Sequence, residues 1–117
     1  MKFNLKRIII FTPNVPMLLG YYSDLMRSEE SSSYIDEDGK WGEIRNENIN
    51  IAFHFGKKRF AKSVVYKLVF QISNTNKCKA KLEKRGFRTS KIFSSGKIEF
   101  FEISDPDGNI IQFSNRK

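Results

Sequence analysis

A short turn sequence near the end of the chain constrains its fold more than any other feature. Residues 99–113 read EFFEISDPDGNIIQF, in which two apolar, β-branched runs flank Asp105-Pro106-Asp107-Gly108. Asp opens turns through its side chain, Pro presets φ and Gly adopts positive φ, so the pattern predicts a tight hairpin between two strands. Because neighbours on a strand point to opposite faces, Gln112 is expected to lie opposite the apolar face of that strand.

The chain as a whole shows one order of elements twice. Strand-like runs alternate with two segments in which a cap residue precedes apolar residues at helical spacing; the cap is Asn14 in the first segment and Asn74 or Thr75 in the second. The first half is expected to hold a strand at 5–12, a helix at 15–26, a weak strand near 28–33 and strands at 41–45 and 49–55. The second half is expected to hold a strand at 64–72, a helix from 74 or 75 to 85, and strands at 87–93, 97–103 and 109–115. This repeat predicts an α+β fold of two βαβββ modules whose curved sheets form a shared cleft.

Composition indicates one ordered globular domain. A length of 117 residues fits a single domain, with module 1 at about 1–55, a linker at about 56–63 and module 2 at about 64–117. The single Cys78 excludes an intramolecular disulfide and a cysteine-based zinc cluster, and the single His54 excludes a site that needs two histidines from one chain. The apolar run near the start is too short to span a membrane, so we expect a cytoplasmic protein.

The positive charge is concentrated in one block. The formal net charge is +8, and residues 57–91 hold twelve Lys or Arg against one acid, Glu83. Such a block is typical of an interaction module for nucleic acid or an acidic protein. The alternative is a solvated basic helix, which is favoured because no aromatic-basic binding motif accompanies the charge.

Three segments then resemble a known family. Residues 104–113, SDPDGNIIQF, are close to the "DPDGN" ending of the vicinal oxygen chelate superfamily, the glyoxalase/bleomycin-resistance/dioxygenase fold. Residues 11–26, FTPNVPMLLGYYSDLM, resemble its first strand and helix, and residues 41–55, WGEIRNENINIAFHF, resemble its third and fourth strands. The resemblance implies two modules that pair within one chain or swap between chains, and it implies a homodimer.

The resemblance also implies where a metal would be held. In that superfamily up to four side chains, one from each of four strands, hold a divalent metal in the cleft. By position they fall on Arg7, on His54 or Ala52, on Lys67 and on Gln112. Arg has no lone pair to donate, Lys coordinates only after losing a proton, and both repel a dication. The residues therefore predict a member that binds no metal and uses no cofactor.

Strand parity gives an independent view of the same cleft. If Arg7 faces the cleft, Ile9 and Phe11 do so too, and if Lys67 faces it, so do Val69 and Gln71. The residues that alternate with these, and with His54 and Gln112 on their strands, then point to the opposite face of the sheet and form an apolar layer there. They are Ile8, Ile10, Phe53, Phe55, Leu68, Phe70, Ile72, Ile111 and Phe113.

Two classes of function follow from the cleft. The first is metal-free binding or sequestering of a small molecule, anionic because Arg7 and Lys67 attract a carboxylate or phosphate. The expected ligand-binding residues are Arg7, Phe11, Trp41, His54, Lys67, Gln71 and Gln112. The second is a metal-dependent lyase or dioxygenase, which needs the metal and a carboxylate base where position 112 offers only an amide. We expect no membrane partner and no nucleic-acid partner.

Overall fold

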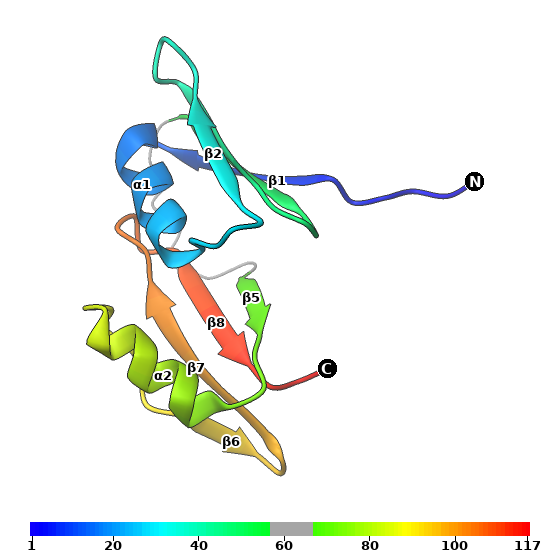
Figure 1. Cartoon of the computed structure of the whole chain (residues 1–117), viewed down its shortest axis with the longest axis vertical. Helices are drawn as coiled ribbons and strands as arrows, with labels where there is room; N and C mark the ends of the chain where they lie inside the picture. Colours follow the sequence, from blue (N-terminus) through cyan, green and yellow to red (C-terminus); the bar gives the residue numbers. More distant parts are fainter. Residues whose placement is uncertain (57–66) are drawn as a thin grey trace. The chain divides into compact units, whose positions relative to one another are not determined.

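The computed structural model describes residues 1–56 and 67–117, which fall into two compact units, Met1–Phe60 and Ala61–Lys117 (Figure 1). The described residues form two helices and two four-stranded mixed sheets, so the predicted α+β class and the repeated βαβββ order are confirmed. The first unit contains β1 (Arg7–Thr12), α1 (Val15–Leu25), β2 (Ser32–Ile35), β3 (Trp41–Arg45) and β4 (Asn50–Phe55). The second contains β5 (Leu68–Gln71), α2 (Thr75–Lys84), β6 (Phe93–Ser95), β7 (Ile98–Ser104) and β8 (Ile110–Ser114).

In the first unit the strands lie in the order β1-β4-β3-β2, and α1 covers one face of the sheet. Asn14 caps α1 by accepting a hydrogen bond from the backbone N–H of Met17, and Pro16 lies in the first turn, where a missing N–H is tolerated. Tyr22 of α1 and Phe53 of β4 are both fully buried, with ring centroids 5.1 Å apart. The core of this unit therefore lies between α1 and one face of the sheet.

The second unit repeats this plan with strand order β5-β8-β7-β6, and α2 lies along β7 (Figure 1). Asn74 caps α2 through the backbone N–H of Lys77, as predicted. Phe113 stands between two other rings of its core, stacked 5.1 Å from Phe101 and 5.5 Å from Phe70. Phe101 is fully buried, so this ring stack is the centre of the second core.

The predicted hairpin at 105–108 is present and explains its sequence. The buried Asp105 side chain accepts hydrogen bonds from the backbone N–H groups of Asp107 and Asn109, both at 2.9 Å, and from the Asn109 side chain at 2.7 Å. Gly108 has φ +87°, a conformation that side chains with a Cβ rarely adopt. The turn thereby sets the antiparallel register of β7 and β8, in which Gln112 lies opposite Glu102.

The predicted strand at 87–93 is wrong, because β6 is Phe93–Ser95. Residues 87–92 contact β7 at Ser90, whose backbone N–H donates to the Glu102 carbonyl oxygen and whose hydroxyl oxygen accepts from the Glu102 backbone N–H. The apolar Phe87 follows a helix-ending Gly86 and its ring lies under the Arg85 guanidinium, so its apolar character does not mark a strand.

The linker at 56–63 and the start of the strand at 64–72 fall largely on residues 57–66, outside the described residues, so the module boundaries stay a prediction.

Neither described helix is long and apolar enough to cross a membrane.

Candidate functional site

The face of the first sheet opposite α1 carries the candidate site. On β1, Ile9 and Phe11 are 40% and 61% exposed, whereas Ile10 between them is 6% exposed. On β4, His54 is exposed and Phe53 is fully buried. The predicted alternation is therefore present along β1. On β4 it holds only for Phe53 and His54, because Asn50 and Ala52, which share the face of His54, are buried. Phe55 departs from it: at 49% exposed it lies at the end of β4, beyond the core.

Aromatic rings form a row across this face. Strand pairing places Phe11 of β1 opposite His54 of β4, and His54 opposite Trp41 of β3. The His54 ring centroid lies 5.5 Å from Phe11 and 5.8 Å from Trp41, and the Trp41 contact is edge-on at 86°. Three of the seven predicted ligand-binding residues are thus in contact with one another. The Nδ1 atom of His54 lies 2.7 Å from the Phe55 carbonyl oxygen, which leaves Nε2 for a ligand.

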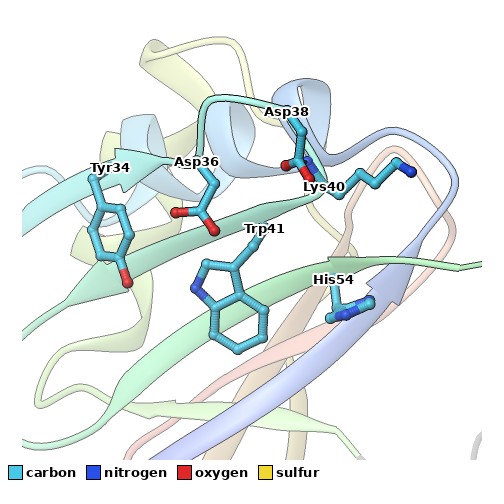
Figure 2. Close-up of a pocket in the computed structure, with 6 residues that line it drawn as sticks. All are labelled: Tyr34, Asp36, Asp38, Lys40, Trp41 and His54. Carbon is cyan, nitrogen blue, oxygen red and sulfur yellow. The ribbon is translucent and has the colours of Figure 1, made fainter.

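At one end of this row the surface is hollowed. An open pocket of about 490 Å³ is lined by Tyr34 of β2, Trp41, His54 and three residues of the turn between β2 and β3, Asp36, Asp38 and Lys40 (Figure 2). The turn is held by hydrogen bonds between β2 and β3: the Asp36 backbone N–H donates to the Trp41 carbonyl at 2.8 Å. The predicted ligand-binding residues include Trp41 and His54 but none of these turn residues.

An ion pair between Arg7 and the buried carboxylate of Glu43 lies next to the aromatic row. The Nε of Arg7 donates to Glu43 Oε2 at 2.8 Å, and the Glu43 side chain is 1% exposed. Glu43 also accepts from the Tyr34 hydroxyl at 2.8 Å and from Asn50 Nδ2 at 2.9 Å. Burial by itself raises the pKa of the Glu43 carboxyl, but these three hydrogen bonds and the Arg7 charge outweigh it and lower the pKa from 4.5 to about 2. Glu43 is therefore ionised and neutralises Arg7.

The second unit carries a similar arrangement on the corresponding face of its sheet. Lys67 forms an ion pair with Glu102 Oε2 at 2.5 Å, and Gln112 Nε2 donates to the same oxygen at 3.3 Å. Val69 is 57% exposed beside Gln112, while Ile111 and Phe113 are buried behind it, as parity predicts. Gln71 is exposed on the same face of β5 as Val69. Lys67 and Gln112 are thus brought together through a carboxylate that sequence reasoning missed.

Strand register relates the two units residue by residue. Ile9, Ala52 and Glu43 form one row of the first sheet, and Val69, Gln112 and Glu102 form the matching row of the second. Between the two alternatives for the fourth strand, Ala52 is therefore the counterpart of Gln112, and His54 corresponds to Ser114. Glu43 and Glu102 are counterparts too. Each lies on the third strand of its unit, and the alternation of side chains along that strand could have placed it on this face. The cation that each one pairs with lies far away in the chain, 36 residues from Glu43 and 35 residues from Glu102.

Comparison with known proteins bears on the fold. No protein-family model and no curated protein matches the chain. An integron cassette protein from the mobile metagenome of the Halifax Harbour sewage outfall is similar with a TM-score of 0.74 at 12% identity, over 97% of this chain and 98% of that one. A glyoxalase family protein from Enterococcus faecalis gives 0.72 at 11% identity, over 95% and 96%. A lactoylglutathione lyase from Agrobacterium tumefaciens gives 0.71 at 10% identity, over 94% and 91%.

The chain has a vicinal oxygen chelate-type fold. At sequence identities of 10–12%, the similarity to these structures shows the fold alone. The function of the chain therefore depends on its own residues.

The side chains at the metal positions that the resemblance implies do not fit a divalent metal. The Arg7 guanidinium offers no lone pair, and the Lys67 ammonium is engaged with Glu102. Ala52 has no donor atom, and Gln112 points its amide nitrogen at Glu102. Among residues 1–56 and 67–117, no three His, Cys, Asp or Glu side chains are grouped so that they could hold a metal ion. The side chains at these positions therefore give no basis for a reaction step that uses a bound metal.

Proposed function

We propose that the protein binds a small organic molecule without a metal, through the exposed aromatic face of its first sheet. The observation that carries the proposal is the row Phe11, His54 and Trp41, which lies beside a pocket on the face opposite α1. Ligand sites typically combine aromatic walls with a few polar groups that fix orientation. Here the polar groups are the Nε2 of His54, the Tyr34 hydroxyl and the acidic turn.

The expected anionic character of the ligand has lost its main support. It rested on Arg7 and Lys67 as free cations, whereas each forms an ion pair with a carboxylate, Glu43 or Glu102. The other predicted ligand-binding residues, Gln71 and Gln112, keep a place in the proposal as hydrogen-bonding groups on the face of the second sheet. The shared cleft, the homodimer and the cytoplasmic location remain parts of the proposal that rest on the resemblance and on the sequence.

Thermal unfolding of metal-stripped protein tests the proposal. We expect zinc, nickel and manganese to leave the melting temperature unchanged. An aromatic compound that binds at the row, at ten times its dissociation constant, should stabilise the protein by about 1.4 kcal/mol. Compounds are screened as cationic, neutral and anionic phenyl derivatives, so that no ligand charge is assumed. Stabilisation by a metal alone would favour the alternative, a metal-dependent lyase or dioxygenase.

A matched pair of variants locates the effect. Trp41→Ala removes a ring of the row and should abolish stabilisation by the compound. Phe55→Ala removes a more exposed ring from the next residue after His54, on the opposite face of β4, and should preserve it. Equal loss in both variants would contradict binding at the aromatic row.

A further inference from the structure

The pocket beside Trp41 joins aromatic rings to negative charge. Its lining includes the rings of Tyr34, Trp41 and His54 and the carboxylates of Asp36 and Asp38. In Figure 2 the Asp36 carboxylate points toward the space between the Tyr34 ring and the Trp41 indole, while Lys40 extends away from the indole. The Asp36 carboxylate makes no side-chain hydrogen bond or ion pair with any residue in 1–56 or 67–117. Its charge is therefore available to a ligand.

The turn that carries these carboxylates is fixed before any ligand arrives. The Gly39 backbone N–H donates to the Asp36 carbonyl at 2.9 Å, and Gly39 has φ +73°. The Lys40 backbone N–H donates to Asp38 Oδ1 at 2.9 Å, which orients that carboxylate. A ligand that meets these groups does not have to order them, and this lowers the entropic cost of binding.

The surrounding sequence has the opposite sign to the rest of the chain. Residues 29–47 hold seven acidic and two basic residues, in a chain whose net charge is +8. The two basic residues are Lys40, on the pocket wall, and Arg45, whose guanidinium lies 4.8 Å from the centroid of the Tyr34 ring. The two carboxylates outnumber the one ammonium on the pocket wall. The local field therefore favours a cation.

The ring geometry favours the same class of ligand. Trp41 meets His54 edge-on, and no ring within residues 1–56 or 67–117 stacks parallel on the indole. A tryptophan face is the best aromatic partner for a cation, and its attraction increases where water is partly excluded. A hard divalent metal would prefer six or more oxygen ligands and gains little from aromatic walls. An organic cation with a flat group satisfies both the rings and the carboxylates.

We propose that the pocket formed by Tyr34, Asp36, Asp38, Trp41 and His54 binds an organic cation that bears an aromatic group. The aromatic part packs on Trp41 and His54, and the positive charge lies against Asp36 and Asp38. This inference rests on the proposed function, because it assigns a ligand class to the same aromatic row.

The experiment compares three phenyl compounds that differ in charge. Trp41 is the only tryptophan of the chain, so its fluorescence reports binding at this pocket directly. Benzyltrimethylammonium, benzyl alcohol and phenylacetate are titrated into the 117-residue protein at low ionic strength. We expect the cation to bind about tenfold more tightly than the neutral compound, the size expected for a partly desolvated cation beside an indole. The preference should weaken as salt is added.

Variants of the turn separate the pocket charge from the general charge of the protein. Asp36→Asn with Asp38→Asn should remove most of the preference for the cation over benzyl alcohol. Glu37→Gln lies between them and makes the same kind of charge change outside the pocket lining, so it should keep the preference. Retention of the preference in the double variant would overturn the proposal.

The remaining outcomes distinguish this inference from the proposed function. Tighter binding of phenylacetate or benzyl alcohol would overturn the cation inference and leave metal-free binding at Trp41 standing. Displacement of the cation by magnesium at constant ionic strength would assign the carboxylates to a metal and also overturn it. If none of the three compounds changes Trp41 fluorescence, the cation inference fails. Stabilisation by another compound that Trp41→Ala abolishes would then still support the proposed function, whereas its absence would end both.

Discussion

Replacing Phe101 with alanine is expected to lower the free energy of unfolding of the second unit by about 4 kcal/mol. Phe101 is fully buried and stacks 5.1 Å from Phe113, which in turn stacks on Phe70. Its removal leaves a cavity between rings that cannot close over it without leaving their stacked geometry. Urea unfolding followed by circular dichroism measures the change.

Phe93→Ala is the matched control for this prediction. It makes the same substitution in the same unit, but Phe93 is 37% exposed and lies on β6 with its ring stacked on Phe100. We expect a loss of about 1 kcal/mol or less, since an exposed ring pair contributes about that much. Equal losses in the two variants would show that the core of the second unit is not centred on Phe101.

Replacing Glu43 with glutamine is expected to cost about 3 kcal/mol near neutral pH. The substitution keeps the shape of the side chain but leaves the partly buried Arg7 without its counter-charge. Glu102→Gln is the matched control, because Glu102 occupies the same position in the other unit and its side chain is 22% exposed. There we expect about 1 kcal/mol or less, the usual size for an accessible ion pair.

The cost of Glu43→Gln should depend on pH in a defined direction. The folded state lowers the pKa of Glu43 from 4.5 to about 2, so ionised Glu43 stabilises the fold above pH 4.5. This contribution is lost as the pH falls through the window from 4.5 to about 2, where the native carboxyl becomes protonated. Wild type and Glu43→Gln should therefore approach equal stability at the acidic end of that window. A difference that stays constant with pH would contradict an ionised, buried Glu43.

The sequence was sufficient for most of the fold because its strongest signals are local. The Asp105 turn, the Asn14 and Asn74 caps and the alternation of β1 each depend on residues a few positions apart. The strand at 87–93 was misplaced for the same reason: Phe87 has strand propensity, but its place after a helix-ending glycine and its contact with Arg85 decide its conformation.

The candidate site was less predictable because its charges are paired across the sheet. Arg7 and Lys67 looked like free cations, since nothing near them in the chain carries an opposite charge. The carboxylates that neutralise them, Glu43 and Glu102, come from strands in the middle of each sheet. Knowledge of the strand register is needed to bring them together. The alternation of side chains along each strand correctly predicted the face on which Phe11 and His54 lie, because that inference needs no knowledge of the neighbouring strand.

Mapping of backbone amide and indole N–H signals by NMR tests metal-free binding most directly. Metal-stripped protein is titrated once with an aromatic compound that stabilises it and once with zinc. The proposal predicts that the compound moves the Trp41 indole signal and the amides of Phe11 and His54, while zinc leaves the signals of Arg7, Lys67 and Gln112 in place. Zinc-dependent shifts at Arg7, Lys67 and Gln112, with the Trp41 indole unmoved by the compound, would contradict it.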